Sequence, residues 1–278
     1  MKYLGLLFLV FIFHFPAKSQ PVKVMSFNIR LDLESDAENK WELRKASMVE
    51  LLNHYEPGIL GVQEAQDHQL KYLVNQLKNH VYIGVGRDDG KTIGEYSALL
   101  YDSTLFNVRH DTTIWLSENG EIGKLGWDAA YPRVCTYGLF ENRSTYQKIW
   151  VFNTHFDHMG NVARSESAKL ILNIIQKVNP ENYPVILTGD FNLTSDTQPI
   201  QLLKSVLTDA FDASVQPHYG PAGTFSGFDP TRILTDRIDF VFTKNMGVQS
   251  IIHIDDRRDD NFFISDHLPV FCTLFIYQ

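Results

Sequence analysis

Residues 184–192 read PVILTGDFN, and this stretch changes from apolar to polar within a few residues. Val185 to Leu187 form a short apolar run of the kind found in buried strands. Asp190 and Asn192 come directly after it, where such a strand would end. Ligands of α/β proteins bind at the carboxyl ends of the strands, so this stretch predicts a functional loop that follows a buried strand.

The same arrangement recurs along the chain, because polar side chains that can bind metals or move protons repeatedly follow or interrupt apolar runs. These side chains are Asn28, Glu64, His155 with Asp157 and His158, Asp239 inside the run Ile238–Phe242, and Asp266 with His267 ahead of the last strand. If these strands form part of one domain, their ends can bring these polar groups close together.

Apolar periodicity assigns the remaining elements. We expect strands at residues 22–29, 59–62, 81–85, 96–101, 134–140, 149–152, 185–187, 238–242, 251–254 and 268–275. We expect helices at residues 41–55, 66–78, 162–178 and 198–207, and irregular loops at 111–131 and 212–236. Strands that alternate with helices predict an α/β or layered α+β fold, with residues 20–278 as a single domain.

Composition excludes several classes of protein. The chain has 278 residues, of which 44% are hydrophobic, and a formal net charge of −8. This balance excludes a disordered chain and argues against a broad basic surface for nucleic acid or membranes. Cys135 and Cys272 are too few for a disulfide scaffold or a thiolate zinc site. We favour two buried thiols, and a bridge between them stays open.

Residues 1–19 have the pattern of a secretory signal peptide. Lys2 precedes the apolar run Leu4–Phe15, and small residues follow at Ala17 and Ser19. The alternative is a membrane anchor, but about twelve apolar residues are fewer than the roughly 20 that a spanning helix needs. We therefore expect an exported protein, periplasmic or extracellular, without stable membrane insertion.

The carboxylates would repel one another if they met in one pocket. At about 4 Å and an effective dielectric constant of 20, each pair of like charges costs about 4 kcal/mol. A bound cation removes this cost, and carboxylate and amide oxygens suit Mg²⁺, Mn²⁺ or Ca²⁺ better than zinc. His155 and His267 could donate hydrogen bonds to phosphate oxygens, and Asp190 could take a proton from water.

Each residue alone also has an ordinary structural explanation. Glu64 could lie in a surface turn, Asp239 could be a buried hydrogen-bonding group, and His155 could be a core histidine with satisfied ring nitrogens. Residues 189–192 could form a simple turn after a strand. The order in which the motifs follow one another is more specific than any one of them.

Taken in order, the Asn28 strand, Gln63-Glu64, Asn153-Thr154-His155, residues 189–192, Ile238-Asp239 and residues 265–269 (SDHLP) resemble the endonuclease/exonuclease/phosphatase superfamily. This resemblance implies a deoxyribonuclease I-like fold, a four-layer α/β sandwich with two facing mixed β-sheets flanked by helices. It also implies hydrolysis of phosphoesters with a divalent metal ion, Mg²⁺ first and Mn²⁺ or Ca²⁺ as alternatives.

The resemblance also implies a role for each matched residue. Glu64 would be the principal metal ligand, with Asn28 and Asp266 near the same ion. The implied catalytic groups are Asp190 to activate water, Asn192 to orient phosphate, His155 and His267 to stabilise charge, and Asp239 as the partner of His267. His158 would contact substrate. Arg133 belongs to none of these motifs and is a separate candidate, as a basic residue that could contact a substrate phosphate. Many relatives carry Pro-Asp where this chain has Pro57-Gly58, a departure at the periphery of the site.

The expected function is hydrolysis of a small organic phosphoester, by a phosphodiesterase or a phosphatase that acts as a monomer. A secreted endonuclease or exonuclease acting on DNA or RNA is the alternative, and the acidic chain makes it less attractive. A non-catalytic binding protein on the same fold is a third possibility. It is disfavoured because every chemical position of the motifs is filled.

Overall fold

The computed structural model describes residues 21–277, whose strands form two six-stranded mixed sheets. The first sheet has the order β11-β12-β1-β2-β4-β3. Its strands are β1 (Val22–Asn28), β2 (Ile59–Ala65), β3 (His80–Ile83), β4 (Tyr96–Asp102), β11 (Met246–His253) and β12 (Val270–Ile276). Only β1 and β2 pair in parallel in this sheet, so their carboxyl ends lie side by side.

The second sheet has the order β5-β6-β7-β8-β10-β9. Its strands are β5 (Phe106–Trp115), β6 (Val134–Asn142), β7 (Lys148–His155), β8 (Val185–Asp190), β9 (Thr208–Asp209) and β10 (Asp239–Lys244). Here β7 and β8 are the parallel pair, and β10 runs antiparallel to β8. Each sheet therefore offers one pair of neighbouring strand ends from parallel strands.

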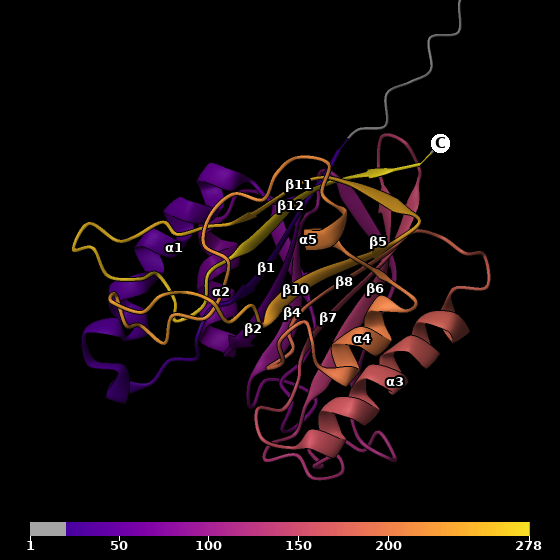
Figure 1. Cartoon of the computed structure of the whole chain (residues 1–278), viewed down its shortest axis with the longest axis horizontal. Coiled ribbons are helices and arrows are strands. Elements are labelled where there is room, and N and C mark those ends of the chain that lie inside the picture. The colour runs from indigo at the N-terminus through magenta and orange to yellow at the C-terminus, as the bar shows by residue number, and fades with distance from the viewer. Residues whose placement is uncertain (1–20, 278) are drawn as a thin grey trace, which may run out of the picture.

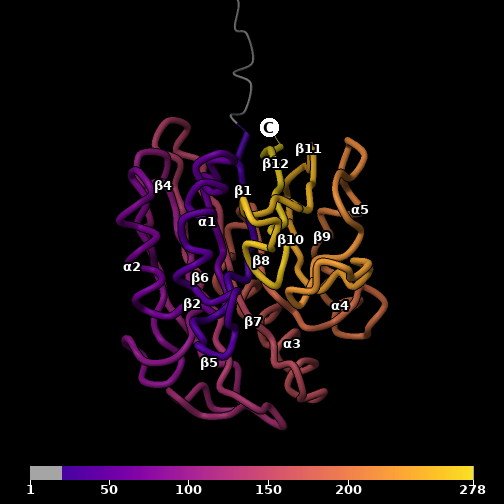
Figure 2. Tube along the Cα trace, turned by 90° about the vertical axis from the view of Figure 1, so that its left-hand side faces the viewer, coloured from indigo at the N-terminus to yellow at the C-terminus, as the bar shows by residue number. Residues whose placement is uncertain are grey.

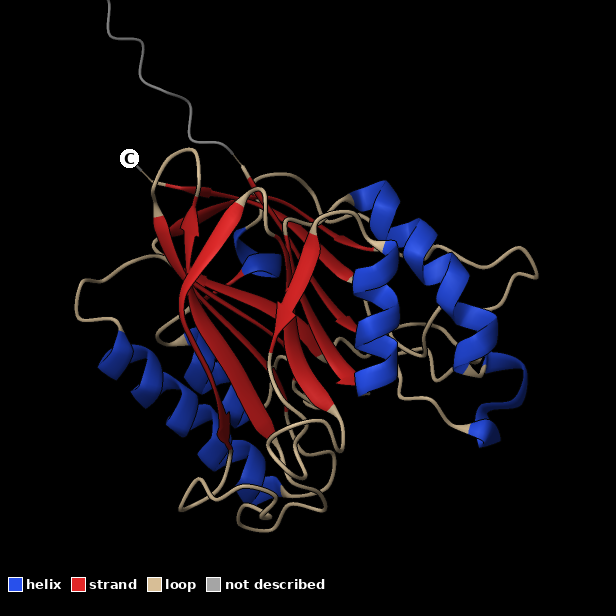
Figure 3. Ribbon diagram, turned by 180° about the vertical axis from the view of Figure 1, so that it is seen from behind, coloured by secondary structure: helices blue, strands red, loops and turns tan. Residues whose placement is uncertain are grey.

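Helices cover the outer face of each sheet, as Figures 1 and 3 show. One core cluster joins α1 (Trp41–Tyr55) and α2 (Asp67–Gln76) to the first sheet, and another joins α3 (Asn161–Val178) and α4 (Gln198–Lys204) to the second. A third cluster lies between the sheets. The short α5 (Ala210–Ala213) and the 3₁₀-helix η1 (Glu34–Asn39) complete the set. This arrangement confirms the four-layer sandwich.

The start of β1 and the end of β12 lie at one end of the sandwich, which Figure 2 shows. The two strands are antiparallel, and Val22 pairs with Leu274. The carboxyl end of β1 therefore points to the opposite end, together with the carboxyl end of β2. The predicted site residues Asn28 and Glu64, at or next to the carboxyl ends of β1 and β2, lie at this opposite end.

Some sequence predictions about the fold were wrong. The strand expected at residues 251–254 is β11, which begins at Met246. No strand was expected at residues 106–110 and a loop was expected at 111–131, but Phe106–Trp115 form the strand β5. This strand lies at the edge of its sheet, with exposed polar residues in its middle and a bulge between Val108 and His110. Its apolar signal is weak for that reason. Val270 begins the last strand later than expected, because Pro269 cannot donate a ladder hydrogen bond.

The structure also bears on the cysteines and on the membrane. Cys135 and Cys272 are buried and free, in different core clusters, which confirms two thiols. Within residues 21–277, no helix combines the length and apolarity needed to span a bilayer. The signal peptide predicted for residues 1–19 lies outside the described residues.

Candidate active site

Five predicted site residues stand at strand ends that face one another across the two sheets. Asn28 and Glu64 come from the parallel strands β1 and β2, and His155 and Asp190 from the parallel strands β7 and β8. Asp239 begins β10 and pairs with Asp190 in the ladder. The topology therefore brings together residues that are up to 211 positions apart in the chain, from Asn28 to Asp239.

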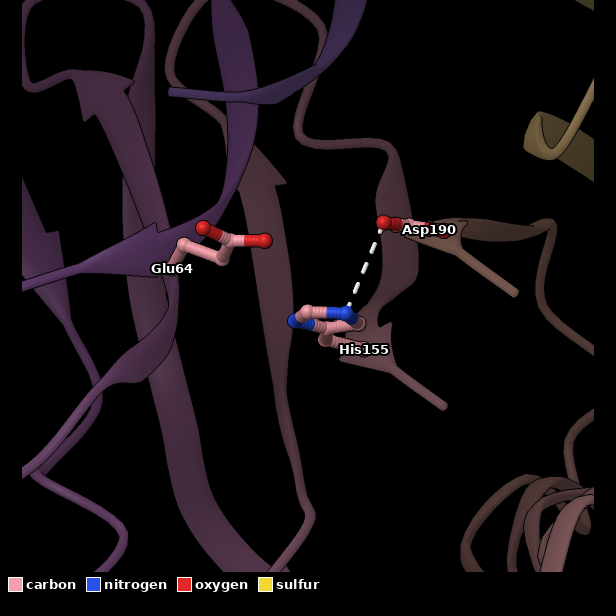
Figure 4. A group of neighbouring side chains, drawn as sticks. All are labelled: Glu64, His155 and Asp190. Atoms are coloured by element: carbon pink, nitrogen blue, oxygen red, sulfur yellow. Dashed lines mark ion pairs between the residues drawn. The ribbon is translucent and has the colours of Figure 1, made fainter. Parts of the chain in front are cut away.

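Asn28 joins the two sheets at the centre of this site. Its Nδ2 donates hydrogen bonds to Glu64 Oε1 at 2.9 Å and to Asp190 Oδ2 at 3.0 Å. One ligand atom from each of Glu64, His155 and Asp190 lies within 4.8 Å of the others. Figure 4 shows Glu64 on its strand, facing His155 and Asp190 across the site. The convergence on which the functional hypothesis depends is therefore present.

Asp190 lies between the two imidazoles. Its Oδ2 is 3.4 Å from His155 Nε2 and 3.6 Å from His267 Nε2. Burial raises the pKa of Asp190 to about 7, and the nearby Asp239 carboxylate adds to the rise while His267 opposes it. A carboxyl group with a pKa near neutrality can both take up and release a proton at physiological pH.

His267 is held by Asp239. The ring Nδ1 donates to Asp239 Oδ2 at 2.8 Å, and Thr224 Oγ1 donates to the same oxygen at 2.6 Å. Burial lowers the pKa of His267, but the carboxylates of Asp239 and Asp190 outweigh this effect and hold the pKa well above its usual value. The His267 ring is therefore a cation that directs Nε2 towards Asp190, as the sequence hypothesis requires.

His155 differs from His267 in charge. Burial, together with the positive charges of Arg133 and Arg87, holds the pKa of His155 well below its usual value. Asn192 Nδ2 lies 3.0 Å from its Nε2 and also donates to Phe156 O. The two histidines thus form an unlike pair, one neutral and one cationic.

Glu95 is a site residue that the sequence hypothesis missed. Its Oε2 lies 4.0 Å from His155 Nδ1, which is buried and has no hydrogen-bond partner among residues 21–277. Burial raises the pKa of Glu95, and Arg87 opposes the rise. Glu95 stands directly before β4, and a polar residue ahead of an apolar run was the only signal in the sequence.

Arg30, two residues after Asn28, is a second missed residue. Asp36 holds its guanidinium through Nε at 2.9 Å and Nη2 at 3.1 Å. Its Nη1 lies 3.9 Å from Glu64 Oε2 and 3.7 Å from Asp266 Oδ2. Arg30 therefore offsets the charge of the two carboxylates that the sequence predicts as metal ligands.

The donor set fits a hard cation. Glu64, Asp266 and Asp190 offer carboxylate oxygens, and Asn28 adds an amide. In this structure Asn28 Oδ1 accepts from the Arg30 backbone N–H, so its amide group orients the carboxylates through Nδ2. Oxygen ligands of this kind suit Mg²⁺, Mn²⁺ or Ca²⁺. Burial disfavours the ionised form of Asp266 and so raises its pKa. A nearby cation would stabilise the ionised form.

Three residues of the site have left-handed backbones although none is glycine. They are Arg30 with φ 58°, Glu64 with φ 62° and Asn192 with φ 51°. Such conformations cost about 1–3 kcal/mol each and collect where the fold must aim a side chain. At Glu64 the β2–β4 ladder also shifts register between Val62 and Ala65. Three of the twelve non-glycine residues with positive φ among residues 21–277 therefore line the cleft.

A buried polar cluster below the site connects the two sheets. Asn153 on β7 donates to Val62 O and Ala98 O at 2.8 Å each. Its Oδ1 accepts from Gln63 Nε2 at 2.6 Å and from Thr188 Oγ1 at 2.9 Å. Gln63 precedes Glu64, while Asn153 and Thr188 stand two residues before His155 and Asp190. The cluster therefore fixes the separation of the strand ends that carry the site.

These groups line a cleft of about 530 Å³ that extends past His155. The two residues predicted to contact substrate, Arg133 and His158, lie in this extension, and Arg133 Nη2 is 3.2 Å from His158 Nδ1. The predicted site residues thus surround one cleft or, like Asn28 and Asp239, contact residues that do. Its volume falls within the range of small-molecule sites, roughly 300–1,000 Å³.

Comparison with known proteins agrees with this geometry. The sequence profile of the endonuclease/exonuclease/phosphatase family matches residues 25–267, a range that includes every predicted site residue. The chain belongs to this family. Endonuclease/exonuclease/phosphatase proteins hydrolyse phosphoesters and generally use a divalent metal ion. The resemblance inferred from the motifs and the fold that it implied are both confirmed.

Solved structures of the endonuclease/exonuclease/phosphatase family superpose on nearly the whole chain. A family protein from Bacteroides thetaiotaomicron is 34% identical with a TM-score of 0.89, covering 94% of this chain and 100% of that chain. A mannosyl-6-phosphatase of the same bacterium is 34% identical with a TM-score of 0.88, covering 92% and 100%. The human nocturnin catalytic domain, 19% identical with a TM-score of 0.73 over 92% and 95%, shares the fold.

Proposed function

We propose that the chain is a divalent-metal-dependent hydrolase of small organic phosphoesters, acting as a phosphatase or phosphodiesterase. The observation that carries the proposal is the position of Asp190 between a neutral and a cationic imidazole, with Glu64 opposite. A carboxyl group that can accept a proton and the His267 cation, which can stabilise negative charge, thus line one cleft. Attack of water on a phosphoryl group requires both.

The protein's own groups divide the proton transfers between them. Asp190 takes a proton from the attacking water as the new oxygen–phosphorus bond forms, a role that contributes about 10²–10⁴-fold. His267, as a cation, donates a hydrogen bond to the phosphoryl oxygen that gains charge. The ester P–O bond breaks, and its electron pair stays on the leaving oxygen. That oxygen takes up one proton from solvent, and Asp190 then returns the proton of the attacking water to solvent. Asn192, held by Phe156 O, orients the phosphoryl group beside His155.

The metal ion would be held by Glu64, with Asp266 and Asn28 beside it. When bound, a cation of this kind polarises phosphoryl oxygens and stabilises the charge on the leaving oxygen. Mg²⁺ is our first choice because the donors are oxygens, and Mn²⁺ or Ca²⁺ would also fit.

Two observations favour a small substrate over a polymer. The cleft has a volume of about 530 Å³, and the chain carries a net charge of −8. Arg87 and Arg133, the basic residues in the extension of the cleft, are both paired with carboxylates. The similarity to a mannosyl-6-phosphatase supports a phosphomonoester as the first candidate.

The test is a substrate panel with purified protein in Mg²⁺ and then in excess chelator. It contains a hexose 6-phosphate, p-nitrophenyl phosphate, bis-nitrophenyl phosphate, plasmid DNA and RNA. We expect turnover of a small phosphoester that stops with chelator and returns with Mg²⁺. Preferential cleavage of nucleic acid that weakens steeply with salt would replace this function by a nuclease activity. Turnover that persists in chelator would contradict the metal assignment.

A further inference from the structure

The half of the cleft beyond His155 has no role in the chemistry proposed above. It is built by segments that leave β3, β5 and β7, and its groups are Arg87, Glu95, Tyr131, Arg133 and His158. This second half adjoins the catalytic groups because Glu95 lies beside His155. A phosphoester held at Asp190 would therefore direct its leaving group either into this half or into solvent.

The charges of the second half cancel. Arg87 bonds Glu95 in a bidentate pair at 2.9 and 2.7 Å, and Arg133 Nε bonds Asp157 at 3.3 Å. Arg133 Nη2 also donates to His158 Nδ1, which requires a lone pair on that nitrogen. A second anionic group would meet the Glu95 carboxylate, which lines the cleft. The second half therefore disfavours a second phosphate.

Paired ionic groups instead offer both kinds of hydrogen-bonding partner. The guanidinium of Arg87 carries N–H donors, and the Glu95 oxygens carry free lone pairs. A hydroxyl group is at once a donor and an acceptor, so it can bond both members of such a pair. A ligand with several hydroxyl groups uses this surface without disturbing its charge balance.

An aromatic surface lies next to these polar groups. Tyr131 stacks on His158 with ring centroids 5.9 Å apart and an interplanar angle of 21°. The Arg87 guanidinium lies 5.2 Å from the Tyr131 ring, and 51% of Tyr131 remains exposed. An exposed aromatic ring beside polar side chains suits a ligand that has an apolar C–H face and a polar edge.

We propose that this half of the cleft, formed by Arg87, Glu95, Tyr131, Arg133 and His158, is a subsite for a neutral polyhydroxyl leaving group such as a monosaccharide. The inference rests on the proposed function and specifies its substrate class as phosphomonoesters of sugars. Tyr131 supplies the apolar contact, and the Arg87–Glu95 pair forms hydrogen bonds with the hydroxyl groups. The catalytic groups then act on the phosphoryl group at the other half.

The kinetic test compares a hexose 6-phosphate with p-nitrophenyl phosphate, whose leaving group lacks hydroxyls, and with a hexose bisphosphate. We expect Tyr131→Ala to lower kcat/KM for the hexose 6-phosphate at least fivefold more than for p-nitrophenyl phosphate, mainly through KM. Tyr146→Ala, at another exposed tyrosine between β6 and β7, is the matched control. It should leave kcat/KM for both substrates unchanged. Equal losses on both substrates, or preference for the bisphosphate, would overturn the subsite.

A binding measurement separates the subsite from the proposed function. Ligand-observed NMR with methyl mannoside, methyl glucoside and glycerol on metal-free protein requires no turnover. We expect the hexosides to bind and glycerol not to, with binding weakened by Tyr131→Ala and by His158→Ala. If no phosphoester is hydrolysed but hexosides bind, the proposed function fails and the subsite stands. If hydrolysis occurs but no hexoside binds and the two variants are not selective, the subsite fails.

Discussion

His267 Nδ1 and Asp239 Oδ2 are joined by a 2.8 Å hydrogen bond, and both residues are buried to more than nine-tenths. The bond fixes the proton on Nδ1 and directs Nε2 towards Asp190, 3.6 Å away. Asp239 stands 28 positions before His267 and begins β10, which lies between β8 and β9. One buried contact thus sets the tautomer, the charge and the direction of the imidazole.

Asp239→Asn should lower kcat about 10- to 100-fold, the range usual for a lost partner of a functional histidine. The variant removes the negative charge that holds the pKa of His267 high, so the ring loses its proton at a lower pH than in the wild type. The alkaline decline in activity should then begin at a lower pH than in the wild type, which a pH–rate profile measures. Asp236→Asn, a partly exposed carboxylate paired with Arg232, is the control. An unchanged alkaline limb would show that Asp239 does not act through His267.

Asp190→Asn should abolish activity and also stabilise the metal-free protein. Because the folded-state pKa is about 7 and the usual value is 3.8, the folded state binds the proton more tightly. Ionised Asp190 therefore costs stability increasingly as pH rises from about 4 to 7. We expect the variant to gain on the order of 4 kcal/mol at pH 8 in chelator, because the pKa of about 7 already includes the attraction to His267. Urea unfolding measures this, and a less stable variant would contradict the pKa assignment.

Glu64→Gln should remove stabilisation by metal. A ligand that binds only the folded state, at 100 times its Kd, stabilises the wild type by about 2.7 kcal/mol. Mg²⁺ should therefore raise the unfolding temperature of the wild type and leave that of the variant almost unchanged. Glu56→Gln, at the far end of the sandwich just after α1, is the control. A full Mg²⁺-dependent shift in Glu64→Gln would place the ion elsewhere.

Asn153→Leu should lower both stability and activity. The substitution removes four hydrogen bonds and leaves buried groups of both sheets without partners, at about 1–3 kcal/mol for each unpaired group. We expect the free energy of unfolding to fall by about 3 kcal/mol or more. Thr188→Val, which keeps the shape and removes one hydroxyl, should cost only about 1 kcal/mol. Equal effects of the two variants in urea unfolding would show that the cluster does not hold the sheets together.

Stability should also fall in acid because of His253, which ends the edge strand β11 and pairs with Val270 of β12. Burial lowers its pKa to about 3 from the usual 6.5, and the neighbouring His218 ring adds to the effect. The unfolded state therefore binds more protons between these values, so stability is present above pH 6.5 and is lost as the pH falls. At pH 4.5 the loss from this group is about 2–3 kcal/mol.

His253→Asn keeps a donor for Pro221 O and removes the titration. We expect urea midpoints of this variant to change less between pH 7 and pH 4.5 than those of the wild type. His54→Asn, on the exposed face of α1, serves as the control and should follow the wild type. If His253→Asn loses as much stability in acid as the wild type, other groups cause the acid sensitivity.

The sequence by itself determined most elements and the identity of the chemical groups. Short apolar runs end in Asn28, Glu64, His155 and Asp190, and they predict strands with functional ends. This is possible because the pattern of apolar and polar residues within a short stretch indicates a buried strand. The apolar pattern did not predict the edge strand β5. Its middle residues, Arg109, His110 and Asp111, are polar and exposed, and the strand is formed by pairing with β6.

The tertiary structure alone decided the distances and the charge states. No local pattern shows that Asn28 bridges Glu64 and Asp190, or that Arg30 and Glu95 lie beside them, because these contacts depend on how two sheets pack. The different charge states of His155 and His267 also arise from packing. Both rings are buried, but the positive charges of Arg133 and Arg87 help to lower the pKa of His155, while the carboxylates of Asp239 and Asp190 raise that of His267. Electrostatic environment is a property of three-dimensional neighbours, which sequence order does not specify.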